Sequence, residues 1–157
     1  MAASMSATVT TTTHMVVDLL ASDPEFHYMR SLREEIELVM ATPEDWARPP
    51  SAVKQLRLLD SALQESLRVN PLVIRGPARE VIPENGIVLP DGQHAPRGSW
   101  LAISVPNVHR DERFYNEPAE YHPFRFLATD KESCKSDIPL GQVGDSFLGF
   151  GHGRTAW

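Results

Sequence analysis

The distribution of proline constrains this chain most, because it changes sharply at Asn70-Pro71. Residues before that point follow helical periodicity, whereas nine of the thirteen prolines lie after Asn70. Proline has no amide N–H, so it blocks helix interiors and central strands alike. The chain therefore predicts a helical first half, followed by a β region that is small and rich in loops.

The first half predicts three helices. Residues 14–21 are compatible with helix, and a second helix follows with Asp23 as N-cap and Pro24 in its first turn. Its apolar stripe has a spacing of three or four residues and consists of Phe26, Met29, Leu32, Ile36 and Val39. The third helix, over residues 51–69, has a similar stripe of Val53, Leu56, Leu59, Leu63 and Leu67. Residues 1–13, rich in Ala, Ser and Thr, fit either a flexible tail or the exposed stub of a helix.

The second half predicts a small β-meander. Short apolar runs at residues 86–89 and 100–105 flank two turn sequences, Pro90-Asp91-Gly92 and Pro96-Arg97-Gly98. A short helix is expected around Asn107. Since a loop-rich segment of about fifty residues is a poor free-standing domain, a cofactor or another domain is expected to organise it.

Composition excludes several classes of function. The 157 residues carry a net charge of −6, which leaves no basic surplus for nucleic acid or an anionic membrane. A single cysteine, Cys134, excludes an internal disulfide framework and a zinc site built on paired cysteines. No membrane segment is expected, because no run approaches the roughly 20 apolar residues that span a bilayer. No signal peptide is expected either, because residues 1–13 have no basic start and no long apolar run.

Three charged residues stand out as a possible buried cluster. Glu65 and Arg68 are three residues apart on the third helix, so their side chains share one face. Arg125 lies between aromatic residues in Pro123-Phe124-Arg125-Phe126, and a buried arginine needs an anionic partner. Glu65 bridging both guanidinium groups would satisfy all three residues.

The C-terminal string has glycines at alternate positions: Gly149, Gly151 and Gly153. Glycine permits an unusual backbone path or the close approach of a flat ligand. With no helix following it, the string does not fit a phosphate-binding loop.

Taken together, these segments resemble the C-terminal half of a cytochrome P-450, a haem-thiolate monooxygenase, and most closely its fungal members. Glu65-Ser-Leu-Arg68 resembles the Glu-x-x-Arg pair of the family's helix K, and Arg125 would complete a Glu-Arg-Arg triad through the Pro-x-Arg-Phe signature. Phe150-Gly-His-Gly-Arg154 resembles the start of the haem-binding loop, Phe-x-x-Gly-x-x-x-Cys-x-Gly.

The resemblance implies a mainly α fold with a small β-meander, forming one partial domain over residues 1–157. The parts would be the end of helix I and helix J at 1–40, helix K at 51–69, the β region at 78–106, the meander at 107–146 and a truncated haem-binding loop at 147–157.

The resemblance also implies roles for individual residues. Thr8 would be the oxygen-activating threonine of helix I, and Arg79 would bond a haem propionate. Further haem contacts would come from Phe150, Gly153 and Arg154.

The axial cysteine of the family falls at position 157, where this sequence has Trp157. An indole cannot supply the thiolate that holds the iron and favours O–O cleavage. Cys134 is expected to be an exposed loop thiol, and the resemblance implies that His152 faces away from the iron. Haem is thus the implied cofactor, and the missing thiolate argues against its binding here.

The implied family role is the monooxygenation of a small apolar substrate, terpenoid or polyketide-like, with electrons from NAD(P)H through a reductase. The chain is predicted to be inactive as it stands. Two alternatives remain: a non-catalytic scaffold for interactions, and a truncated gene model of an active enzyme. Family members are anchored in the endoplasmic reticulum membrane by an N-terminal half that is expected to be missing here, so the chain would be cytoplasmic.

Overall fold

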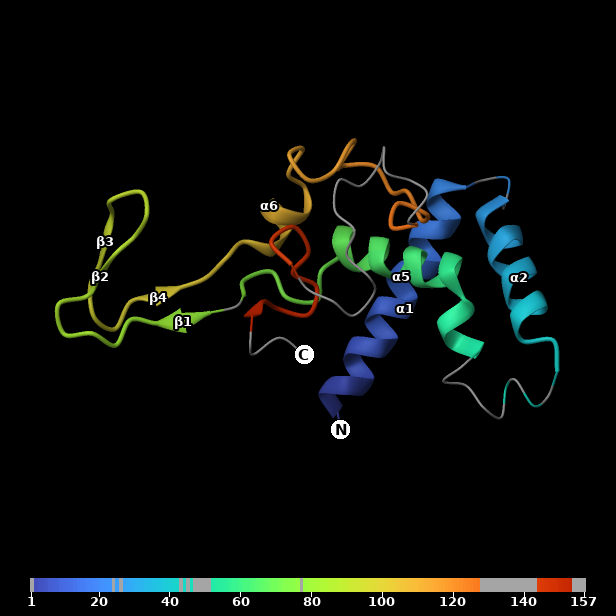
Figure 1. The fold of residues 1–157 in the computed structure, drawn as a ribbon, viewed down its shortest axis with the longest axis horizontal. Helices are drawn as coiled ribbons and strands as arrows, with labels where there is room; N and C mark the ends of the chain where they lie inside the picture. The colour runs from blue at the N-terminus through green and yellow to red at the C-terminus, as the bar shows by residue number, and fades with distance from the viewer. Residues whose placement is uncertain are drawn as a thin grey trace.

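The computed structural model describes residues 2–23, 25, 27–42, 44, 46, 52–76, 78–127 and 144–153, with side chains from residue 5 onwards. Three longer helices form the body, and a thin β arm extends away from it (Figure 1). The fold is mainly α with small antiparallel strands, which confirms the predicted fold class.

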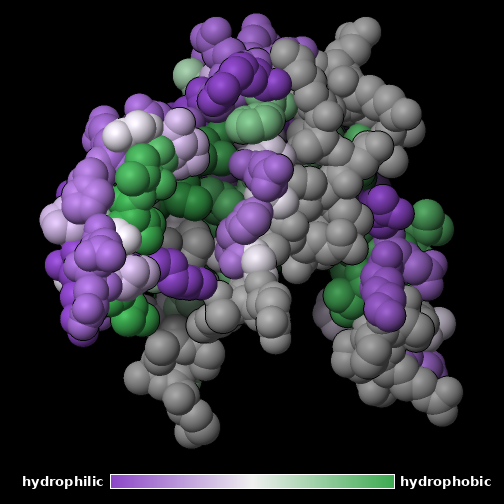
Figure 2. All heavy atoms as spheres, turned by 60° about the vertical axis from the view of Figure 1, so that its left-hand side comes forward, coloured by the Kyte–Doolittle hydropathy of each residue, from purple (hydrophilic) through white to green (hydrophobic). Residues whose placement is uncertain are grey.

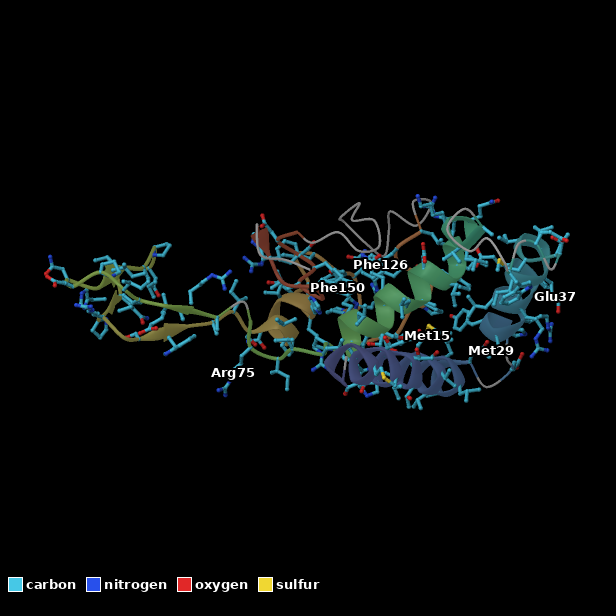
Figure 3. The ribbon with its side chains drawn as sticks, turned by 90° about the horizontal axis from the view of Figure 1, so that it is seen from below. Met15, Met29, Glu37, Arg75, Phe126 and Phe150 are labelled. Atoms are coloured by element: carbon cyan, nitrogen blue, oxygen red, sulfur yellow. The ribbon has the colours of Figure 1, made fainter. Side chains whose placement is uncertain are left out.

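Helix α1 spans Ala2–Ser22, so the threonine tract at residues 10–13 is helical rather than part of a tail. Threonine is a weak helix former, and tertiary packing decides such a segment. Here Leu19 is buried, and Met15 packs beside it on the side of α1 that faces the other helices (Figure 3). Packing of α1 on α5 therefore supplies the stability that the sequence of the tract lacks.

Helix α2 spans His27–Val39 and begins later than the sequence predicts. The carboxylate of Asp23 accepts a hydrogen bond from the N–H of Tyr28, which satisfies an amide of the first turn of α2. Pro24 lies outside the described residues. Leu32 is the buried residue of this helix, and Glu37 lies on its outer side (Figure 3).

Helix α5 spans Arg57–Val69 and follows the short 3-10 helix η1 at Val53–Gln55. Its N-terminus is capped by a neighbour: the two oxygens of Glu35 accept hydrogen bonds from the N–H groups of Leu58 and Leu59, at 2.7 and 3.0 Å. The hydrophobic core joins Leu19, Leu32 and Ala62 from the three helices. The predicted stripe is only partly buried, since Val53 is exposed and polar residues fill the buried face of α5: Ser61, Gln64, Glu65, Ser66 and Arg68.

The arm, residues 78–104, consists of two hairpin ladders. Strand β1 (Arg79–Glu80) pairs antiparallel with β4 (Trp100–Leu101), and β2 (Ile87–Val88) pairs antiparallel with β3 (His94–Ala95). The two predicted apolar runs thus contain strands, although each strand is only two residues long. Figure 2 shows apolar side chains exposed among polar ones on one face of the molecule. The exposed apolar residues of the arm include Ile82, Val88 and Trp100.

After the arm, the chain returns to the body through helix α6, Val105–His109, close to the predicted position. Irregular structure follows as far as residue 127, and the segment 144–153 lies against α6 (Figure 1). Phe150 lies toward the C-terminal end of α5, whereas Phe126 lies along the helix, where its N–H donates to Ser61 Oγ at 3.0 Å (Figure 3). The end of α5, α6 and the segment 144–153 therefore meet in one region of the molecule.

Candidate functional site

The largest fully buried side chains in the described chain include two arginines, Arg68 and Arg125. Glu65 lies between them, and all three side chains are fully buried. Arg68 donates to Glu65 from Nε and Nη2, both at 2.8 Å, and Arg125 Nε lies 3.0 Å from Oε1 and 3.1 Å from Oε2. The structure thus brings the three predicted residues together around one carboxylate.

The other guanidinium donors of this cluster bind backbone carbonyls of residues 109–120. Arg68 Nη1 donates to the carbonyls of His109 and Pro118, both at 2.8 Å. Both arginines donate through Nη2 to the carbonyl of Glu120, at 3.0 and 3.1 Å. Because these carbonyls belong to a loop without regular ladders, the buried charges fix its path.

A cleft of about 650 Å³ lies beside this cluster, within the roughly 300–1,000 Å³ that is usual for ligand and cofactor pockets. Its walls come from α1, α5, the segment 72–76, Ala78, the start of α6 and the loop 148–151. The lining is largely apolar and consists of Ala7, Thr8, Thr11, Thr12, Leu63, Leu67, Leu72, Val73, Arg75, Gly76, Ala78, Val105, Leu148, Gly149, Phe150 and Gly151.

Glycines shape the loop wall of the cleft. Gly151 has a φ of 94°, a conformation that disfavours any residue with a Cβ. At Gly149, a Cβ would lie 2.8 Å from Cζ of Phe147, closer than real contacts allow. The loop wall therefore alternates the side chains of Leu148 and Phe150 with glycines that carry none.

His109 connects this loop to α5. Its Nδ1 lies 3.0 Å from the carbonyl oxygen of Arg68, and the N–H of Leu148 donates to its Nε2 at 2.8 Å. Burial, reinforced by the charge of Arg68, lowers the pKa of His109 from 6.5 to about 4, so the imidazole is neutral at physiological pH.

The other predicted site residues fall in different places. Thr8 and Phe150 line the cleft. Arg79 lies at the start of β1, with Nη1 2.8 Å from the carbonyl of Ala78, itself a cleft residue. Among the described residues, the arginine that lines the cleft is Arg75, which the sequence analysis missed; no local motif marks it.

The end of the loop is described only as far as Gly153, which has a φ of 71°. The ring of His152 is partly exposed, and its Nε2 lies 3.0 Å from Asp145 Oδ1. Arg154, Trp157 and Cys134 lie outside the described residues.

The described residues contain no group of three or more His, Cys, Asp or Glu side chains placed to hold a metal ion. In the same part of the chain, no helix is both long and apolar enough to cross a membrane.

Comparison with known proteins gives a consistent result. The family model described as Cytochrome P450 matches residues 1–156. The chain is 39% identical over 153 residues to cytochrome P450 monooxygenase nodZ of Hypoxylon pulicicidum, covering 90% of this chain and 30% of that protein. It is 40% identical over 148 residues to cytochrome P450 monooxygenase lnaC of Aspergillus flavus, covering 94% of this chain and 28% of that protein. The chain thus spans less than a third of the length of these relatives.

Proposed function

Because the chain belongs to the cytochrome P450 family, we propose that its cleft receives the flat face of a haem and that Trp157 leaves this haem without a thiolate ligand. The family implies a haem, a substrate and a redox partner. As it stands, the chain would then be a haem-site segment that does not perform thiolate-dependent oxygenation. The observation that carries the proposal is the 650 Å³ apolar cleft bounded by the glycine loop.

The residues of the cleft fit a large, flat and mostly apolar cofactor. Leu63 and Leu67 of α5 and Val105 of α6 provide apolar surface. In the loop wall, Gly149 and Gly151 carry no side chain, which leaves room for a flat ring to approach the backbone. An apolar cleft excludes water and stabilises an apolar ring system by burial. Bound through a thiolate, haem supplies the O–O cleavage of monooxygenases.

Two kinds of polar group are placed at this cleft. Thr8, Thr11 and Thr12 bring hydroxyl groups from α1. We propose Thr8 as the oxygen-activating threonine. Arg75 lines the cleft, and Arg79 follows the cleft residue Ala78. We propose that one of these guanidinium groups would pair with a haem propionate.

The proposals for the substrate and the electron donor follow from the family resemblance. The longer protein to which this segment corresponds would oxidise a small apolar molecule of secondary metabolism, with electrons from a reductase. The apolar lining of the cleft supports an apolar substrate.

The test is a haem titration of the full chain and of Trp157→Cys, each also carrying Cys134→Ser to remove the native thiol. We expect both proteins to take up haem. In the carbon monoxide difference spectrum of the reduced samples, we expect a thiolate-shifted Soret band for Trp157→Cys only. A thiolate-shifted band in the protein that retains Trp157 would contradict the proposal.

A non-catalytic scaffold is the second candidate, and the cluster of Glu65, Arg68 and Arg125 favours it. The hydrogen bonds described above for these side chains go to protein groups, so the cluster needs no cofactor to be satisfied. In that case neither protein would take up haem in the same titration, although both would fold.

A further inference from the structure

We propose that His109 is a positioning residue for the cleft: as a neutral imidazole protonated at Nδ1, it fixes the loop 147–151 to the end of α5. The consequence for haem rests on the proposed function above. The consequence for the loop itself does not.

The two ring nitrogens face groups of opposite character. The carbonyl oxygen of Arg68, 3.0 Å from Nδ1, can only accept a hydrogen bond. The N–H of Leu148, 2.8 Å from Nε2, can only donate one. Both bonds form together in one state of the ring, the neutral tautomer with its proton on Nδ1.

Contacts around the ring hold it in this orientation. The side chain of Arg68 donates from Nη1 to the carbonyl of His109 at 2.8 Å, so the two residues bond each other's backbone carbonyl. The imidazole also stacks on Phe147, with 5.1 Å between centroids and 9° between planes. His109 is fully buried, so water does not compete for these bonds.

The position of His109 matters because both of its partners adjoin the cleft. Leu148 lines the cleft together with Gly149, Phe150 and Gly151, while Arg68 follows the cleft residue Leu67. The two hydrogen bonds thus set the separation between the loop wall and the α5 wall.

A protonated ring would disrupt this arrangement. A proton on Nε2 would place two N–H groups against each other at Leu148. The charged groups that act on His109 are Arg68, which disfavours the imidazolium, and Glu65, which favours it. Burial outweighs the carboxylate, so the neutral ring prevails.

The first test compares His109→Phe with wild type, using His94→Phe as a matched control. Phenylalanine retains an aromatic ring to stack on Phe147 but forms neither hydrogen bond. His94 lies on the exposed arm, where its Nε2 contacts the carbonyl of Asn85 at 2.8 Å. The readouts are hydrogen exchange of the Leu148 amide, exchange of the α5 amides, and the dissociation constant for haem.

We expect His109→Phe to speed exchange at Leu148 about tenfold, as the loss of one hydrogen bond would, and to weaken haem binding by about the same factor. The α5 amides should keep their protection, and the His94→Phe control should match wild type. A general loss of stability would instead speed exchange at Leu148 and throughout α5 together, and that result would overturn the proposal.

A second test needs no variant. Long-range ¹H–¹⁵N NMR of the wild-type histidine rings should show His109 as the neutral Nδ1–H tautomer, and an Nε2–H tautomer would overturn the proposal. Should wild type take up no haem, the proposed function fails. The tautomer and the exchange of Leu148 still decide whether His109 fixes the loop.

Discussion

At the scale of single residues, the chain buries charge as thoroughly as it buries hydrocarbon. Glu65, Arg68 and Arg125 are fully buried, as are Ala62 and Phe147. Buried ions persist only when each is paired and its remaining polar atoms are bonded. The many carbonyls bound by the two arginines meet that requirement.

Glu65→Gln should lower the free energy of unfolding by about 3–5 kcal/mol, because it leaves two buried guanidinium groups without an anion. Urea unfolding followed by circular dichroism measures the change. Glu84→Gln is the control: Glu84 is exposed and 3.7 Å from the exposed Arg97, so its change should stay within about 1 kcal/mol. Equal effects at the two positions would contradict the prediction.

His109 should contribute stability that is lost in acid. The pKa is lowered from 6.5 to about 4 in the folded state, so the unfolded chain binds more protons between these values. Protonation of His109 therefore takes no stability from the fold above the higher value, and the loss grows as the pH falls through the window. The full loss in acid is on the order of 3 kcal/mol. Urea unfolding at neutral and acid pH should show a stronger acid loss for wild type than for His109→Gln, which does not titrate; equal pH dependence would rule this out.

Sequence reasoning succeeded at this scale where the signal was local. The three-residue spacing of Glu65 and Arg68, and the aromatic setting of Arg125, predicted one shared cluster. The contacts of His109 were not predicted, because its partners are the carbonyl of Arg68 and the N–H of Leu148, 41 and 39 residues away. Nearly every residue carries the same backbone N–H and carbonyl groups, so no sequence pattern shows which of them a distant side chain will bind.

At the scale of elements, a side chain of one helix caps the N-terminus of another. The carboxylate of Glu35, on α2, binds two N–H groups of the first turn of α5. These amides have no partner within their own helix, and a negative charge there also favours the helix dipole. The sequence of α2 does not mark this contact, since the position of α5 relative to α2 is set by tertiary packing.

Glu35→Ala should lower the free energy of unfolding by about 1–2 kcal/mol, the usual effect of removing a helix cap. Glu34→Ala is the control, because Glu34 is exposed on the same helix and its loss should change stability by less than about 0.5 kcal/mol. Thermal and urea unfolding measure both. A result in which Glu34→Ala matched Glu35→Ala would show that the capping contacts contribute nothing.

Helix positions were predicted well and boundaries less well. Periodic apolar residues located α2 and α5, and Pro71 marked the end of α5. The threonine tract was left undecided, because its helix depends on packing against α5 rather than on its own residues.

At the scale of the whole molecule, the stability of the chain is unevenly distributed. The three helices share one core, whereas among the residues of the arm only Val81 and Ala95 count as buried apolar side chains. Segments with few buried contacts open locally at a small free energy. The family resemblance is confirmed by the match over residues 1–156.

Rates of amide hydrogen exchange should therefore differ between the arm and the helical body. The ladder amides of the arm, such as Val81 and Leu89, should exchange before the amides of α5, because local opening exposes the arm without disturbing the core. Exchange read by NMR or by mass spectrometry of short peptides tests this order. Equal protection in the arm and in α5 would mean that the two unfold as one unit.

The buried carboxylate also has a consequence for the order of events during synthesis. Glu65 meets its first arginine three residues later, but its second lies 60 residues further along the chain. Until Arg125 has left the ribosome, α5 can form as a helix but cannot bury Glu65 in its final setting. Closing so distant a contact is slow compared with forming a helix. We therefore expect the irregular stretch between α6 and Arg125 to take up its final path only after Arg125 has been synthesised. The buried centre of the structure is then completed by a residue made long after α5.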